Sequence, residues 1–322
     1  EWQSLFLTGW HFLATTADLP NPGDYVTQRV GPLSIIIRNF GHGDYQAFLN
    51  VCAHRYSELA SEKCGNIATF SCQYHGWEFD REGNTKRIPD APCFKPLEKG
   101  QLGLKHFRTA TVGQLIFVSF AENGPTIQEF LGSCYADIER CDTDRYEQVY
   151  ALDQVCDANW KLIVENTLES YHIDMIHRQT IQHMPSPENC SHELHDQYSV
   201  FRTTPIPPGS FRYWVEETLA KSIEQPAKHN YVNLRFFPGL TISYEDMIVI
   251  LQSNLPLDAT HSICIYRFLT PKTKNWRTRL INQFYRPSMV KFWVRVIHED
   301  LGFLPKMQKG IQSHELPKGG LL

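Results

Sequence analysis

Two short segments of the chain each combine a cysteine with a histidine: Cys52-Ala53-His54 and Cys72-Gln73-Tyr74-His75. Two thiolates and two imidazoles can hold a [2Fe–2S] cluster, with the sulfur ligands on one iron and the nitrogen ligands on the other. The same four residues could also hold a structural zinc ion. Zinc ligand pairs are usually separated by two or more residues, whereas one residue separates the first pair here. The spacing favours the iron–sulfur cluster and leaves zinc open as the alternative.

A second group of possible metal ligands lies further along the chain. His172 and His177 follow a stretch with helical spacing of apolar residues, and His298-Glu299-Asp300 stands near the C-terminus. Two imidazoles and one carboxylate form the facial triad that holds non-heme Fe(II) and leaves positions open for oxygen. On a regular helix, five positions correspond to about 140° of rotation. We therefore expect a distortion near Ile173–Ile176 if both histidines face one metal.

The first group resembles the Rieske motif of the ring-hydroxylating oxygenases, in the segments Cys52–Arg55 and Cys72–Trp77. The flanking residues Asn50-Val51 and Phe79-Asp80 also match that family. The resemblance implies that Cys52, His54, Cys72 and His75 bind a [2Fe–2S] cluster. It covers nearly the whole chain, because the catalytic domain of the family carries Glu-Asn, an acid, Tyr-His and a second histidine in the order found around His172.

The resemblance also implies roles for the second group. His172, His177 and Asp300 would bind the mononuclear iron, since the family pattern is Glu-Asp with the aspartate bound. Glu169 would be the acid that couples His75 of the cluster to His172, and in the family this bridge crosses between the subunits of a homotrimer. Many members of the family have aspartate at that position, and the glutamate here is a weak hint of quaternary amine oxygenases.

The order of turn signals and apolar runs predicts two domains of an α+β protein. The first third alternates short apolar runs with turns, and Asn123-Gly124-Pro125 then interrupts the pattern. We expect an all-β Rieske [2Fe–2S] domain over residues 1–122. Residues 123–322 would form the catalytic mononuclear iron domain, which the resemblance predicts to have a helix-grip (START-like) fold with a curved antiparallel sheet.

Local patterns predict four elements of the second domain. We expect a helix over Trp160–Tyr171, loops from His183 to Pro208, and strands over Tyr231–Leu269. A terminal amphipathic helix is expected over Ser288–Ile311, broken by its glycine and proline. The aromatic stretches Phe211–Trp214 and Tyr231–Tyr244 are candidates for the walls of a substrate pocket.

Composition narrows the class of protein. The chain has 322 residues and a formal charge of -4, and it shows no basic stripe that would bind nucleic acid. Its apolar runs are too short to cross a bilayer. Nine cysteines, an odd number, argue against a disulfide framework and favour a reducing, cytoplasmic location. The chain begins at Glu1 rather than methionine, so we expect the natural N-terminus to be missing, which leaves an upstream segment open.

The resemblance implies that the chain is the terminal oxygenase (alpha) component of a Rieske non-heme iron oxygenase. It would use O₂, and electrons from a partner reductase or ferredoxin, to hydroxylate a small organic substrate in the catabolism of aromatic compounds. NAD(P)H would act indirectly, because the chain has no nicotinamide fingerprint. The reaction could be monooxygenation, dioxygenation or demethylation, and a small beta subunit could join the assembly.

Three alternatives stay open. The substrate could be a quaternary ammonium compound similar to carnitine or betaine, which aromatic walls would attract through cation–π contacts. The protein could instead be a Rieske electron-transfer protein without oxygenase activity, or a helix-grip binding protein that has lost catalysis.

Overall fold

The computed structural model describes residues 1–95, 102–182, 185–204, 209–222, 227–273, 275–313 and 315–316. Backbone contacts divide the chain into two compact units, Glu1–Thr143 and Asp144–Leu322. The expected boundary between residues 122 and 123 stays a prediction, and the segment after it packs with the first unit. The α+β class, with an all-β N-terminal domain and an antiparallel sheet in the catalytic domain, is confirmed.

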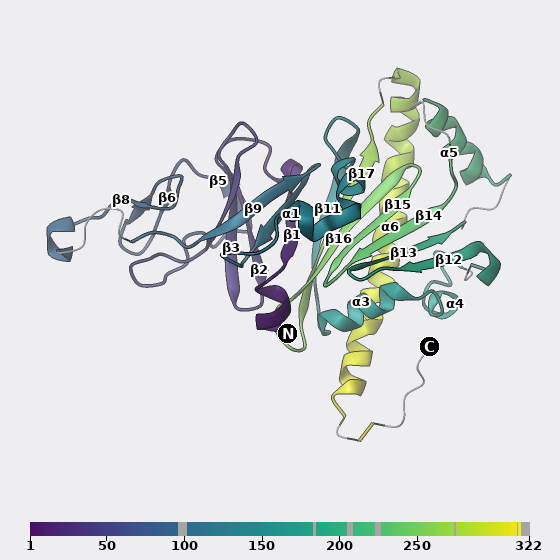
Figure 1. Ribbon diagram of the computed structural model, residues 1–322. Helices are drawn as coiled ribbons and strands as arrows, with labels where there is room; N and C mark the ends of the chain where they lie inside the picture. The colour runs from purple at the N-terminus through teal and green to yellow at the C-terminus, as the bar shows by residue number, and fades with distance from the viewer. Residues whose placement is uncertain are drawn as a thin grey trace. The chain divides into compact units, whose positions relative to one another are not determined.

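The first unit contains a seven-stranded sheet and a smaller three-stranded sheet (Figure 1). The large sheet has the strand order β1-β10-β9-β4-β3-β2-β5, with its strands at β1 Trp10–Thr15, β2 Asp24–Val30, β3 Leu33–Asn39, β4 Tyr45–Leu49, β5 Cys64–Asn66, β9 His106–Val112 and β10 Leu115–Ser119. The small sheet joins β6 Phe70–Ser71, β7 Glu78–Phe79 and β8 Thr85–Arg87. The short helical elements are η1 Trp2–Phe6, η2 Thr16–Asp18, η3 Ala91–Phe94, α1 Ile127–Leu131, η4 Gly132–Cys134 and α2 Tyr135–Glu139.

The hairpin between β9 and β10 shows how one residue type fixes a turn. Val112 pairs with Leu115, so the turn has two residues, and Gly113 adopts a φ of +60° that glycine takes without strain. A Cβ at this position would lie 2.8 Å from the carbonyl oxygen of Ile138. The turn therefore needs glycine both for its backbone conformation and for the close approach of α2.

The second unit is built on a seven-stranded antiparallel sheet in the order β11-β17-β16-β15-β14-β13-β12. Its strands are β11 Tyr146–Cys156, β12 Cys190–Leu194, β13 Tyr198–Thr203, β14 Tyr231–Phe236, β15 Leu240–Glu245, β16 Ile248–Pro256 and β17 Ser262–Pro271. Its helical elements are α3 Trp160–Leu168, α4 Ile173–Ile176, η5 Pro187–Asn189, α5 Phe211–Ser222 and α6 Trp276–Ile311. Buried side chains of α3 and α6 pack on the strands β16 and β17, and Figure 1 shows the long α6 running beside the sheet.

The C-terminal helix differs from the expectation. α6 is continuous over 36 residues and begins twelve positions earlier than predicted, and both Pro287 and Pro305 lie inside it. A proline inside a helix costs about 3 kcal/mol. Burial of α6 side chains such as Ile297 and Leu304 against the sheet, at roughly 1.5–3 kcal/mol each, outweighs that cost. Gly302 is tolerated because its surface position faces open space.

One other local expectation was partly wrong. The segment expected to be loops contains the antiparallel hairpin of β12 and β13, which the pairing with β14 holds in place. His183, Met184 and residues 205–208 of that segment lie outside the described part. The expected strands over Tyr231–Leu269 are confirmed. Within the described residues, no helix has the length and apolar character needed to cross a membrane.

Candidate metal centres

Two loops of the first unit present the cysteine–histidine pairs, and they share one backbone design. The first loop leaves β4, and the second connects β6 to β7. In each loop the cysteine N–H donates to the carbonyl five residues later, and the N–H four residues later donates back to the cysteine carbonyl. These pairs are Cys52 N–Ser57 O at 2.8 Å, Tyr56 N–Cys52 O at 3.0 Å, Cys72 N–Trp77 O at 2.9 Å and Gly76 N–Cys72 O at 2.9 Å. The same backbone hydrogen bonds therefore give the two cysteine–histidine loops the same turn.

The four side chains of these loops meet. Cys52 and Cys72 are buried, with 1% and 3% exposure, and their thiols interact directly. The imidazole rings of His54 and His75 lie 4.6 Å apart between centroids. Burial raises the pKa of Cys52, the nearby Cys72 raises it further, and burial lowers the pKa of His54. Nδ1 of His54 is buried without a hydrogen-bond partner among the described residues. A buried nitrogen without a partner beside two buried thiols fits a metal-bound group.

Aromatic residues and Asn50 hold the loops in place. Trp77 stacks on His54 at 4.9 Å with an interplanar angle of 7°. The buried Asn50 side chain accepts the N–H groups of Leu59 and Ala60 at 3.1 and 3.0 Å, and it donates to the carbonyl of Ala60 at 2.8 Å. Asn50 therefore closes the first loop behind Cys52 and His54 through a side chain that has all its partners inside the protein.

A second grouping in the other unit brings together His172, His177 and Asp300. Oδ1 of Asp300 lies 3.5 Å from Nε2 of His172 and 3.1 Å from Nε2 of His177. One ligand atom from each residue lies within 4.8 Å of the others, which is the spacing of a metal site. The set fits Fe(II), because two imidazoles and one carboxylate on one side leave the other side free.

The local fold explains how two histidines five positions apart reach one point. The helix α3 ends at Leu168, earlier than expected, and His172 and His177 then stand at the two ends of the single turn α4. The break falls before His172 rather than within Ile173–Ile176, so the expected place of the distortion was wrong. The turn α4 keeps its backbone hydrogen bonds, with Ile176 N donating to His172 O and His177 N to Ile173 O, so the two side chains reach Asp300 from the two ends of one turn.

Neighbouring acids orient the imidazoles of this grouping. Glu169 accepts from Nδ1 of His172 at 2.5 Å, and Glu299 accepts from Nδ1 of His177 at 2.9 Å. A carboxylate at Nδ1 keeps the proton there and leaves Nε2 free to bind a metal. Burial by itself would lower the pKa of His177, but Asp300 and Glu299 outweigh it and raise that pKa.

The two adjacent acids of the C-terminal helix therefore occupy different places. Asp300 faces both Nε2 atoms and also accepts from Nδ2 of Asn166 at 3.1 Å. Glu299 lies behind His177, where it accepts the hydroxyl proton of Thr180 at 2.6 Å and pairs with Arg295 at 3.4 Å. This geometry favours Asp300 as the ligand and Glu299 as the residue that positions His177.

A cavity of about 280 Å³ opens beside this grouping. Its walls combine apolar side chains such as Phe201, Ile250 and Trp293 with a polar row from β14 and β15. Within that row, Asn233 donates to the hydroxyl of Tyr231 at 2.9 Å. A small cavity that combines apolar walls with polar and charged groups beside a metal grouping is typical of a substrate site.

One of the two aromatic stretches proposed from the sequence forms part of the cavity. Tyr231–Tyr244 contributes Tyr231, Asn233, Arg235 and Ser243 to its wall, although only the first of these is aromatic. In the other stretch, Trp214 is 61% exposed and Tyr213 stacks on His229 instead. The side chains of residues 211 and 212 lie outside the described part. Sequence reasoning missed Phe201, Trp293 and the buried cation Arg235. A signal existed only for Arg235, as a charged residue inside a predicted strand.

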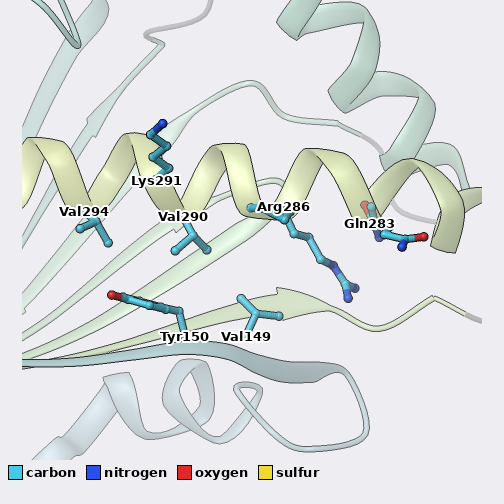
Figure 2. A pocket seen from close by; sticks show the side chains of 9 residues that line it. Val149, Tyr150, Gln283, Arg286, Val290, Lys291 and Val294 are labelled. Carbon is cyan, nitrogen blue, oxygen red and sulfur yellow. The ribbon is translucent and has the colours of Figure 1, made fainter.

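A larger and more open depression of about 550 Å³ lies between β11 and α6. Figure 2 shows Val149 and Tyr150 on the strand, with Val290, Val294 and Arg286 reaching toward them from the helix. None of the nine residues that line it is a cysteine, a histidine or an acid. It offers no metal ligands, so the smaller cavity is the candidate active site.

Comparison with known proteins agrees with this arrangement. Residues 9–108 match the Rieske [2Fe-2S] domain, and residues 143–322 match the ring hydroxylating alpha subunit (catalytic domain). The two metal groupings lie within these two matches. The fold and sites define a protein with a Rieske domain followed by a mononuclear iron domain. The chain belongs to the family of ring-hydroxylating oxygenase alpha subunits.

Individual relatives span different substrates. The chain is 31% identical over 180 residues to the large subunit of anthranilate 1,2-dioxygenase from Burkholderia cepacia, covering 52% of this chain and 42% of that one. It is 30% identical over 181 residues to the oxygenase subunit of glycine betaine monooxygenase from Chromohalobacter salexigens, covering 56% and 40%. The chain thus spans about two fifths of the length of these curated relatives.

Solved structures share the fold. The quaternary ammonium Rieske monooxygenase CntA in complex with the inhibitor MMV12 matches with a TM-score of 0.78 at 18% identity, over 97% of this chain and 81% of that one. Naphthalene 1,2-dioxygenase with indole bound in the active site matches with a TM-score of 0.75 at 22% identity, over 96% and 77%.

Proposed function

We propose that this chain is the terminal oxygenase component of a Rieske oxygenase system, which hydroxylates a small organic substrate with O₂. The observation that carries the proposal is the grouping of His172, His177 and Asp300 on the wall of a cavity. An electron-transfer protein has no need of a second metal grouping beside a cavity, so this observation disfavours that alternative.

The proposal assigns the metal ligands as follows. Cys52, His54, Cys72 and His75 hold the [2Fe–2S] cluster, and His172, His177 and Asp300 hold the mononuclear iron. When bound, the cluster stores an electron and the iron supplies the redox chemistry between O₂ and substrate. Glu299 and Glu169 keep the two iron-binding imidazoles in the right tautomer, and the mostly apolar walls keep water away from the reacting groups.

Glu169 also has the place needed to couple the two centres. One of its oxygens accepts from Nδ1 of His172, and the carboxylate is still partly exposed, with its side chain at 36%. We infer that it accepts a second imidazole N–H from His75 of a neighbouring copy in a homotrimer. Reducing equivalents then come from a reductase or ferredoxin that draws on NAD(P)H. None of the nine cysteines forms a disulfide, which suits a reducing, cytoplasmic setting.

The substrate is most simply an aromatic compound, as in the anthranilate and naphthalene dioxygenases. A quaternary ammonium compound is the second candidate, because a glycine betaine monooxygenase is among the relatives and because Tyr231 and Trp293 stack at 5.8 Å on the cavity wall. Electron-rich aromatic faces attract such cations.

A single-turnover experiment tests the proposal. Anaerobic protein is reduced with dithionite, the excess reductant is removed, and ¹⁸O₂ is admitted with benzoate, naphthalene or glycine betaine. We expect ¹⁸O in the hydroxylated product of benzoate or naphthalene, or conversion of glycine betaine to dimethylglycine and formaldehyde, and no product from a matched His172→Ala variant. A protein that carries both metals, is reoxidised by O₂ and yet converts none of these substrates would favour electron transfer alone.

A further inference from the structure

Arg235 stands out among the residues of the cavity because it is a buried cation. Alternate residues of β14 face the cavity, so Tyr231, Asn233 and Arg235 line it while the residues between them face the other side of the sheet. Arg235 is only 7% exposed, and its side chain lies 5.9 Å above the ring of Phe201. A guanidinium is protonated in essentially all protein environments, so the cavity carries a fixed positive charge.

The guanidinium of Arg235 has unused donors. Its Nε and Nη1 atoms are buried without a hydrogen-bond partner in the described part of the chain, and no carboxylate there forms an ion pair with it. On the adjacent strands its neighbours in register are Ser199 and Thr241, which carry no charge. Buried charges are normally paired, because an isolated one is costly to keep away from water.

The acid whose charge acts on Arg235 accepts its hydrogen bonds from other groups. Burial lowers the pKa of Arg235, and Tyr231 and Glu169 oppose that lowering. However, the two carboxylate oxygens of Glu169 accept from Nδ1 of His172 and from the backbone N–H groups of Tyr171 and His172. Glu245 also lines the cavity, and it has an interaction of its own. In the described part of the chain, the charge of Arg235 is therefore offset only from a distance, and no carboxylate accepts a hydrogen bond from its guanidinium.

We propose that Arg235 binds a carboxylate of the substrate, so that the chain oxidises a small organic acid. The inference rests on the proposed function, since it takes the occupant of this cavity to be the oxygenase substrate. The planar fork of a guanidinium matches a carboxylate with two parallel hydrogen bonds, which gives orientation as well as affinity.

The rest of the cavity limits what the acid can be. Apolar side chains of Phe201, Ile250 and Val296 surround the remaining volume, so the body of the acid is apolar or a soft cation that aromatic walls accept. A total of about 280 Å³ admits one small molecule. Asn233 adds a polar point next to the fork, since its Oδ1 is buried without a partner in the described chain. That acceptor suits an N–H or O–H group of the substrate.

The test compares acids with analogues that lack the carboxylate on the metal-loaded protein. The pairs are benzoate and benzamide, phenylacetate and phenylacetamide, and glycine betaine and choline, and binding is measured by calorimetry and by the shift in Tm. We expect at least one acid to bind, its analogue without the carboxylate to bind roughly 30-fold or more weaker, and Arg235→Met to remove that preference. Arg235→Lys keeps the positive charge but loses the planar guanidinium, so it should retain part of the preference for the acid.

Two controls separate a binding role from a structural one. Arg202→Met changes an arginine of the adjacent strand β13 that pairs with Glu193 on the surface, and it should leave the acid preference unchanged. Ligand-free Arg235→Met should be at least as stable as the parent, because it removes a buried charge that has no partner. A large loss of stability would show that Arg235 holds the sheet together instead.

The results that overturn the inference differ from those that overturn the proposed function. Amides that bind as well as acids, acids that bind equally to Arg235→Met, or no binding by any acid would reject the carboxylate site. These outcomes reject the carboxylate site only if the same preparation has normal iron content and is reoxidised normally by O₂. Absence of the metals would instead reject the oxygenase.

Discussion

Replacement of Glu299 by glutamine tests how the iron-binding histidines are held. Glu299 accepts from Nδ1 of His177 at 2.9 Å and from Thr180 at 2.6 Å, and Arg295 lies 3.4 Å away. Glutamine has the same shape but no charge, so a charge-assisted hydrogen bond of about 1.5–3 kcal/mol becomes a neutral one of about 1 kcal/mol. The loss of roughly 1–2 kcal/mol corresponds to about 5–30-fold weaker metal binding.

This magnitude lies near the range of about 10–100-fold found when residues that orient a metal ligand are changed. The assay is anaerobic equilibrium dialysis against Fe(II), with the absorbance of the Rieske cluster as an internal standard for intact protein. We expect Glu299→Gln to bind iron weakly but to saturate at high Fe(II). Asp300→Asn, which removes the proposed ligand itself, should bind far less iron over the same range.

A matched control is Glu193→Gln, which neutralises a surface acid of β12 paired with Arg202. It should bind iron as the parent does. The reasoning would be refuted if Glu299→Gln lost iron completely while Asp300→Asn retained it, because the two acids would then have exchanged roles. It would also be refuted if neither variant changed the affinity.

Three further predictions concern coupling, loop stability and pH. Glu169→Ala should keep both metals yet lose product formation coupled to reduction of the cluster, and full activity would reject the bridge. Asn50→Leu removes buried hydrogen bonds that close the first cluster loop. Urea unfolding should show a free energy of unfolding lower by roughly 3 kcal/mol. An unchanged unfolding midpoint would contradict this prediction. Burial lowers the pKa of His11 from 6.5 to about 4, and the unfolded chain takes up this proton first as pH falls. The free energy of unfolding should therefore drop by about 3 kcal/mol between pH 6.5 and 4, a slope that His11→Phe should flatten.

The metal groupings were accessible from the sequence because their spacing is local. Cys52 and His54 lie in one loop, and Cys72 and His75 in another, so each pair can be recognised without knowing the fold. His172 and His177 likewise flank one short turn. Asp300 required the family resemblance, since nothing in the sequence alone separates it from Glu299. The structure separates them by placing one acid at the Nε2 atoms and the other behind His177.

The cavity was not accessible in the same way. Phe201 on β13, Arg235 on β14 and Trp293 on α6 come together through strand pairing and helix packing between distant segments. No local sequence pattern predicts that residues from such distant segments will line one cavity. The same cause explains the error in α6, where local rules for Pro305 predicted a break and packing against the sheet overrode them.

The iron content of anaerobically purified protein tests the two-centre arrangement most directly. We predict the two irons and two sulfides of one cluster plus one further iron per chain. His172→Ala should remove only the single iron, and Cys72→Ser should remove the cluster. Zinc in place of iron at the cysteine–histidine pairs, or an iron content that neither variant changes, would contradict the account.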